Sequence, residues 1–111
     1  MRPTFSSHAK ERAEKRLQLY GRSLEHEFSK AVPIPEKTLN FWKSWKKAKQ
    51  NAAMNSIPGL QLGECSRISQ VFVSKIRDEL VLWLCIDSAI ITVYTETHKA
   101  VGKILLDSVT K

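Results

Sequence analysis

The sequence predicts an α+β fold in which helices come first along the chain and an antiparallel sheet follows. Apolar residues recur at helical spacing in residues 1–55, whereas β-branched and aromatic residues fill short segments of 56–111 that are separated by two-residue turn signals. The chain has 111 residues, a length that suits one hydrophobic core. We therefore expect a single domain over 1–111, made of a basic helical half and a β-rich half.

The first expected helix runs from Ser7 to Tyr20. Ser6 or Ser7 can cap its start and Gly21 can end it. One face carries apolar residues at helical spacing, namely Ala9, Ala13, Leu17 and Tyr20.

The second and third helices follow at short intervals. Ser23 can cap a helix from Leu24 to Val32, which Pro33 and Pro35 then close. The third helix is expected over Pro35–Met54. It carries an aromatic and alanine stripe at Phe41, Trp45, Ala48 and Ala52 and places lysines on its other faces.

The β-rich half predicts a meander of three to four strands. Two-residue connections at 77–78 and 87–88 require antiparallel neighbours. The strands are expected at Leu60–Leu62, Arg67–Ile76, Glu79–Ile86 and Ala89–Thr95. A last segment, His98–Ser108, is read as a helix capped by Thr97 or as another strand. We expect the helical stripes to cover one sheet face and to leave the other face, or its rim, for function.

Charge is divided unequally between the two halves. The chain has 18 Lys and Arg against 11 Asp and Glu, for a net charge of +7. Residues 1–55 hold 12 basic and 5 acidic residues, while 56–111 hold 6 of each. The excess favours a polyanion as partner, with nucleic acid the first choice and an anionic membrane surface the second.

Membrane, secretion and metal functions have little support. The longest apolar stretch, Leu80–Tyr94, is interrupted at 87–88 and is too short to span a bilayer. Met1–Ser7 lacks the apolar core of a signal peptide, so we expect a cytoplasmic protein without a membrane partner. Cys65 and Cys85 form no metal-binding spacing, and Cys85 is expected in the core. No metal or cofactor is expected.

Two groups of residues suggest a chemical site. His8 and Arg12 are four positions apart, so an imidazole and a guanidinium share one helix face. Thr92 and Tyr94 are two apart and share one strand face, and Lys75 precedes the neighbouring turn. Structural roles explain the same residues: a surface or capping His8, a core-edge Tyr94 and a solvated Lys75.

The segment Phe5–Arg16, together with Ile91–Tyr94, resembles small proteins with the pattern HA-x-x-R-x-x-x-R followed by TVY. These proteins are similar to the RelE-like branch of the barnase, EndoU, colicin and RelE superfamily of ribonuclease toxins. The resemblance covers about the first twenty residues and the last long strand. The Lys-rich third helix has no counterpart in the compact members.

The resemblance implies a metal-independent endoribonuclease that acts on messenger or transfer RNA. The ribose 2′-hydroxyl attacks the phosphate and leaves a 2′,3′-cyclic phosphate and a 5′-hydroxyl. His8 would be the acid or base, and Lys75 and Tyr94 would complete the catalytic set. Phosphate and base contacts would come from Arg12, Arg16, Arg77 and Thr92. Implied partners are RNA, as ribosome-bound message or tRNA, and an antitoxin or inhibitor protein.

Two other functions remain open at this stage. The third helix interleaves Lys43, Lys46 and Lys47 with Phe41 and Trp42, as in a non-catalytic module that binds nucleic acid. An ordinary amphipathic helix explains the same pattern. The third class is a small phage or mobile-element protein whose basic half docks on a host protein. No GxSxG, P-loop or GxGxxG motif is present.

Overall fold

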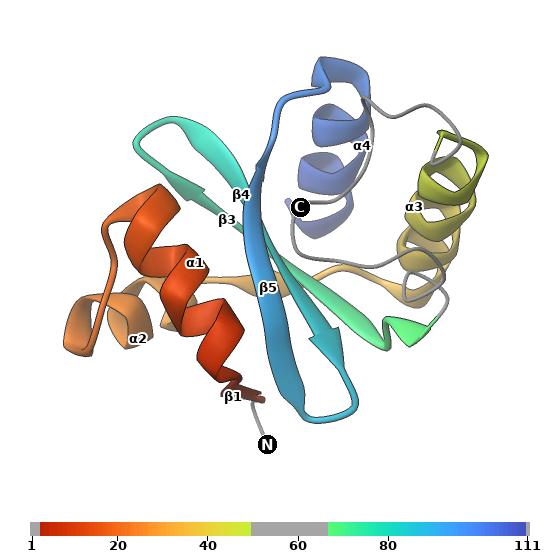
Figure 1. The fold of residues 1–111 in the computed structure, drawn as a ribbon. Helices are drawn as coiled ribbons and strands as arrows, with labels where there is room; N and C mark the ends of the chain where they lie inside the picture. The colour runs from red at the N-terminus through yellow and green to blue at the C-terminus, as the bar shows by residue number, and fades with distance from the viewer. Residues whose placement is uncertain (1–2, 50–66, 111) are drawn as a thin grey trace.

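The computed structural model describes residues 3–49 and 67–110. This part of the chain forms one sheet with strand order β1-β5-β4-β3-β2 and four helices (Figure 1). The elements, in chain order, are β1 (Thr4–Phe5), α1 (Ser7–Leu17), α2 (Arg22–Ser29), β2 (Val32–Pro33), α3 (Glu36–Lys49), β3 (Gln70–Ile76), β4 (Glu79–Ile86), β5 (Ala89–Glu96) and α4 (Lys99–Val109).

The α+β class is confirmed, but the sheet differs from a simple meander. Strands β3, β4 and β5 form the expected antiparallel meander, and two short strands extend it to five. Strand β1 pairs parallel to the start of β5, and β2 pairs antiparallel to β3. Two-residue strands have no periodicity of their own, so the sequence pattern does not reveal them. The expected strand at 60–62 lies outside the described residues.

Both predicted hairpin turns are present. Arg77 and Asp78 adopt positive φ angles of 53° and 66°, and Asp87 adopts 56°. At 77–78, positive φ at both central residues gives the turn a twist that matches two right-twisted antiparallel strands, whereas at 87–88 the first central residue alone has a positive φ. Arg77 is an uncommon residue in this conformation, and its guanidinium donates to the carbonyl of Leu17 at 3.1 Å. That bond ties the β3–β4 turn to the end of α1.

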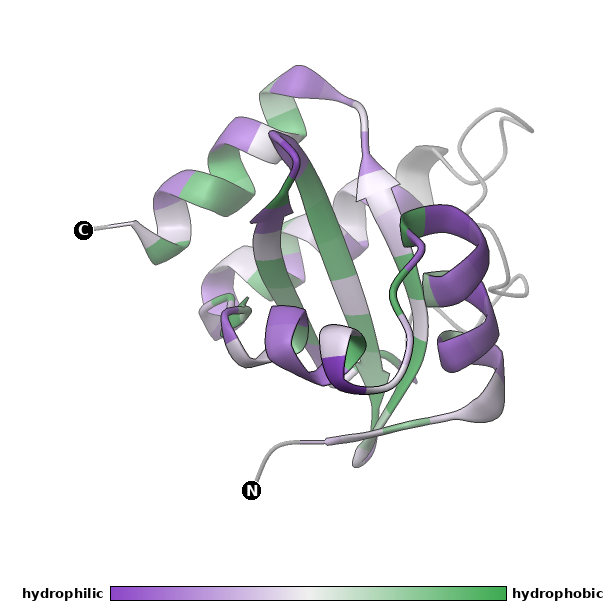
Figure 2. Ribbon diagram, turned by 90° about the vertical axis from the view of Figure 1, so that its left-hand side faces the viewer, coloured by the Kyte–Doolittle hydropathy of each residue, from purple (hydrophilic) through white to green (hydrophobic). Residues whose placement is uncertain are grey.

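Helices cover both faces of the sheet, so the prediction of one uncovered face is wrong. Helices α1 and α2 pack on one face, and α3 and α4 pack on the other (Figure 1). In Figure 2 the strands are mainly in the hydrophobic colour, whereas the helices mix hydrophilic and hydrophobic residues. Both faces need cover because the central strand β4 directs apolar side chains to each of them. Leu82 and Leu84 face α3 and α4, whereas Val81 and Trp83 face α1 and α2.

The first two helices are shorter than predicted. Gln18, with φ 57°, ends α1 in the left-handed conformation, before the expected stop at Gly21. Tyr20 therefore lies outside the helix and is 67% exposed. Helix α2 ends at Ser29, and Val32 pairs with Val73 as part of β2 instead of extending the helix.

Helices α3 and α4 also depart from the predicted pattern in detail. The inward face of α3 contains Leu39 and the fully buried Trp42, whereas Phe41 is 40% exposed. Of the apolar stripe predicted for α3, Phe41 therefore does not face the core, and its neighbour Trp42 does. The last segment is a helix, and its cap is His98 rather than Thr97, because the His98 Nδ1 accepts from the Val101 amide at 3.3 Å.

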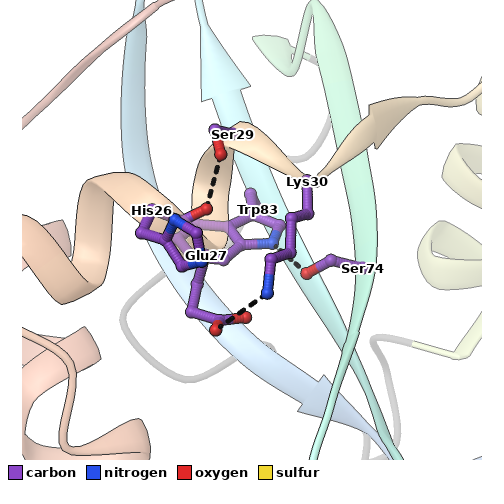
Figure 3. Close-up of polar contacts among 6 residues, drawn as sticks. All are labelled: His26, Glu27, Ser29, Lys30, Ser74 and Trp83. Carbon is purple, nitrogen blue, oxygen red and sulfur yellow. Dashed lines mark hydrogen bonds and ion pairs between the residues drawn. The ribbon is translucent and has the colours of Figure 1, made fainter.

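An aromatic cluster fills the space between α2 and the sheet. The ring centroid of Phe28 lies 5.1 Å from those of Phe5, Phe72 and Trp83. The Trp83 indole Nε1 donates to the Ser74 Oγ at 2.9 Å, so the buried indole nitrogen has a partner (Figure 3). These aromatic residues belong to the same hydrophobic core as the buried residues of α1.

Cys85, on the same face, is 2% exposed, as expected for a core residue. Burial raises the pKa of its thiol. In a Cys65→Ser variant, alkylation of Cys85 by iodoacetamide should be about a hundredfold or more slower in the native protein than in urea, because reaction requires transient opening. The raised pKa contributes stability below the ordinary thiol pKa, and this contribution is lost as pH rises through the folded-state value. Equal native and denatured alkylation rates would contradict this packing.

Candidate nucleic-acid interface

Helix α1 places a basic face at one side of the sheet. Ser6 Oγ accepts from the Ala9 amide at 3.1 Å and caps the helix. Ala9 and Ala13 are fully buried, and these small side chains allow α1 to pack closely on β5. His8, Arg12 and Arg16 recur every four residues and therefore follow a neighbouring helix face.

These residues line a surface hollow of about 340 Å³ together with Glu11 and Lys15. Lys15 Nζ lies 2.9 Å from Glu11 Oε1, so the acid and one cation neutralise each other. The hydrogen bond from Lys15 is the largest cause of the lowered pKa of Glu11, followed by the charges of Lys15, His8 and Arg12. Within 3–49 and 67–110, neither Arg12 nor Arg16 has a carboxylate within ion-pair distance.

Arg16 is anchored to the sheet. Its Nη1 donates to the Val93 carbonyl at 3.0 Å. Partial desolvation lowers the pKa of Arg16, and the charge of Arg12 lowers it further, but a guanidinium remains charged in proteins. The Nε of Arg12 is buried and has no hydrogen-bond partner among the described residues. The hollow therefore offers two partly immobilised guanidinium groups and an imidazole, a set suited to phosphate oxygens.

The predicted strand residues lie elsewhere. Thr92 is fully buried and Tyr94 is 7% exposed. Tyr94 belongs to the core on the α3 and α4 face, and Thr92 pairs with Leu84 of that face, whereas Val93 faces α1. The prediction that Thr92 and Tyr94 share a face is confirmed. The prediction that His8 and Tyr94 meet in one pocket is wrong, because the sheet separates them.

Lys75 and Arg77 are also outside the hollow. Lys75 is exposed near the end of β3, and the alternation with Val71 and Val73 places it on the α3 and α4 side. Arg77 donates to the Leu17 carbonyl, at the opposite end of α1 from His8. The catalytic set His8, Lys75 and Tyr94 is thus not assembled.

The lysines of α3 are engaged within the protein. Lys43 Nζ donates to the Ile68 carbonyl at 2.9 Å. Lys46 is 5% exposed, so the prediction that it lies on a solvent face is wrong. Its Nζ lies 3.4 Å from Glu96 Oε2 and 4.7 Å from the Trp45 ring centroid. The side chain of Lys47 is outside the described part. Lys43 and Lys46 therefore both have partners within the protein.

Sequence reasoning did not single out Glu11 and Lys15 as parts of the site. Their i, i+4 spacing was the available signal, since it predicts a surface ion pair on the helix. Glu96 was also missed, because nothing local marks it as the partner of a lysine 50 positions away.

No family model, curated protein or solved structure significantly matches the chain. In residues 3–49 and 67–110, no group of three or more His, Cys, Asp and Glu residues is placed to hold a metal ion. None of the helices in that part has the length and apolar character needed to cross a bilayer.

Proposed function

We propose that this protein binds RNA and that the phosphate-binding site is the basic hollow on α1. The observation that carries the proposal is the convergence of His8, Arg12 and Arg16 in one hollow with two guanidinium groups not neutralised by described carboxylates. The same three residues are part of the pattern in Phe5–Arg16 and Ile91–Tyr94 that resembles ribonuclease toxins. The net charge of +7 supports a polyanionic partner.

Removal of the two arginine charges tests the site. The variant Arg12→Gln/Arg16→Gln should bind single-stranded RNA about 30-fold to 1,000-fold more weakly, because it removes two charged phosphate contacts that contribute about 1 to 2 kcal/mol each. The slope of log affinity against log salt should fall by about 1.4, the value for two phosphate contacts on a single strand. Fluorescence anisotropy at several salt concentrations measures both quantities.

A matched control removes the same charge from other surfaces. Lys10 and Arg22 are exposed, and neither lines this hollow. The variant Lys10→Gln/Arg22→Gln should retain RNA affinity within a few-fold, as general electrostatic attraction alone decreases. Equal losses in the two double variants would refute a localised site on α1, provided that both variants keep the thermal unfolding midpoint of the wild type.

Metal-independent RNA cleavage is the second candidate, and the position of His8 in the same hollow favours it. A base takes the 2′-hydroxyl proton, the oxygen attacks phosphorus, and the 5′-oxygen leaves with a proton supplied by an acid. His8, Glu11 and Lys15 are the groups in the hollow that can carry these protons, and Arg12 and Arg16 can stabilise the phosphate charge. End-labelled RNA incubated in EDTA should yield 2′,3′-cyclic phosphate ends. If the protein binds RNA but does not cleave it, the cleavage hypothesis is refuted and the RNA-binding proposal stands.

A further inference from the structure

A second hollow lies between α1 and α2, on a different face of α1 from the basic hollow. The two hollows share no lining residue. Helices α1 and α2 cover the same face of the sheet and are joined by the short connection 18–21 (Figure 1). The second hollow has a volume of about 290 Å³. Its lining includes Phe5, Lys10, Glu14, Tyr20, Leu24 and Glu25.

Tyr20 presents an exposed aromatic ring to this hollow from a fixed main chain. Its amide donates to the Ser23 Oγ at 3.1 Å, and the Ser23 hydroxyl donates to the Tyr20 carbonyl at 2.7 Å. The preceding residue, Leu19, is buried in the core. The side chain of Tyr20 is nevertheless 67% exposed. The ring therefore offers a face on which an apolar or cationic group can stack.

Apolar side chains form another part of the lining. Leu24 is buried and Phe5 is half-buried, and both belong to the core cluster under α1 and α2. Such a surface contacts the methylene groups of a long polar side chain while its charged end meets polar groups. The volume of about 290 Å³ lies at the lower limit of small-molecule sites, about 300–1,000 Å³. The hollow therefore suits one side chain better than a cofactor.

The charge of the hollow is opposite to that of the whole protein. Glu14 and Glu25 are exposed, and neither has an ion pair among the described residues. Lys10 also lines the hollow and is not within ion-pair distance of a described carboxylate. Two carboxylates and one ammonium give the lining a charge of −1, in a chain of net charge +7. The complementary ligand is therefore a cation, whereas phosphate is repelled.

An arginine side chain matches these features better than a lysine side chain. Glu14 and Glu25 belong to different helices, and a guanidinium has five N–H donors with which it can reach both. It is also planar and stacks on aromatic rings, whereas a lysine ammonium is a compact, strongly hydrated charge. We propose that this hollow binds an arginine side chain of another protein. The proposal concerns a separate surface and does not depend on the RNA-binding function.

Three short peptides test the site on the full chain by two-dimensional NMR. Each has one central residue between two glycines and blocked ends, and the central residue is arginine, lysine or citrulline, the neutral isostere of arginine. The arginine peptide should shift the amide signals of 20–25 saturably. The lysine peptide should bind about threefold more weakly and the citrulline peptide about tenfold more weakly, because they lack the planar group and the charge, respectively.

Three variants assign the binding to the lining residues. Glu14→Gln/Glu25→Gln should weaken binding of the arginine peptide about tenfold, since both acceptors lose their charge. Tyr20→Leu should weaken it about threefold, because an apolar side chain remains but the aromatic face is lost. Lys10→Gln should strengthen it about twofold, because a cation that competes for the carboxylates is removed.

The matched control is Glu36→Gln/Glu79→Gln, which removes two exposed carboxylates outside the hollow. It should change affinity for the arginine peptide by less than about twofold. Both double variants should keep the thermal unfolding midpoint of the wild type. Absence of saturable shifts, equal binding of the arginine and citrulline peptides, or equal losses in the two double variants would each overturn the proposal. Displacement of the arginine peptide by single-stranded RNA would assign the hollow to nucleic acid and would overturn it as well. The RNA test on Arg12 and Arg16 has its own outcome, because neither residue lines this hollow.

Discussion

Replacement of Glu96 by alanine is expected to lower the free energy of unfolding by about 3 to 5 kcal/mol. The side chains of Glu96 and Lys46 are only 4% and 6% exposed, and their charged atoms are 3.4 Å apart. Removal of the carboxylate leaves the Lys46 ammonium without its counter-ion beneath α3. The rings of Trp45 and Tyr94, with centroids 4.7 and 5.4 Å from Lys46 Nζ, compensate for only part of that loss. Urea unfolding followed by circular dichroism measures the change.

The double variant Lys46→Met/Glu96→Leu tests whether the unpaired charge causes the loss of stability in Glu96→Ala. It removes both charges and retains apolar volume, so its stability should be close to that of the wild type. A third variant, Glu27→Ala, breaks the surface pair with Lys30, whose side chain is 57% exposed, and should change stability by no more than about 1 kcal/mol. A loss in the double variant as large as in Glu96→Ala would show that packing, not the unpaired charge, is responsible.

This ion pair also shows where sequence reasoning stops. The i, i+4 spacing of Phe41 and Trp45 suggested that all α3 lysines face water. The structure instead buries Lys46, because a carboxylate from β5 reaches it across 50 positions of sequence. Periodicity describes one helix at a time, whereas burial of a lysine is decided by what the facing element contributes.

The meander and the basic face of α1 were predictable because they depend on local sequence signals alone. Two-residue turns at 77–78 and 87–88 and the apolar strands beside them are local signals, and both hairpins formed as expected. The spacing of His8, Arg12 and Arg16 likewise needs only helical geometry. Strand alternation also placed Thr92 and Tyr94 on a common face. Strand alternation does not determine which helices cover that face. The prediction that His8 and Tyr94 lie in one pocket was therefore wrong.

If the hollow cleaves RNA, His8→Ala should lower the single-turnover cleavage rate by about 10² to 10⁴, the usual contribution of a positioned acid or base. RNA affinity should remain almost unchanged, because Arg12 and Arg16 provide the charged contacts to phosphate. Rates are measured in EDTA on an RNA whose binding has been saturated, so that the loss belongs to the chemical step.

The exposed His26 of α2 provides the matched control, since it does not line the hollow and His26→Ala removes the same side chain. Its rate should equal that of the wild type. Tyr94→Phe gives a second contrast: Tyr94 lies across the sheet from His8, so the loss of its hydroxyl should leave cleavage unchanged as long as the fold is intact. Cleavage lost with Tyr94→Phe but retained with His8→Ala would place the chemistry on the α3 and α4 side and would refute a catalytic role for the α1 hollow.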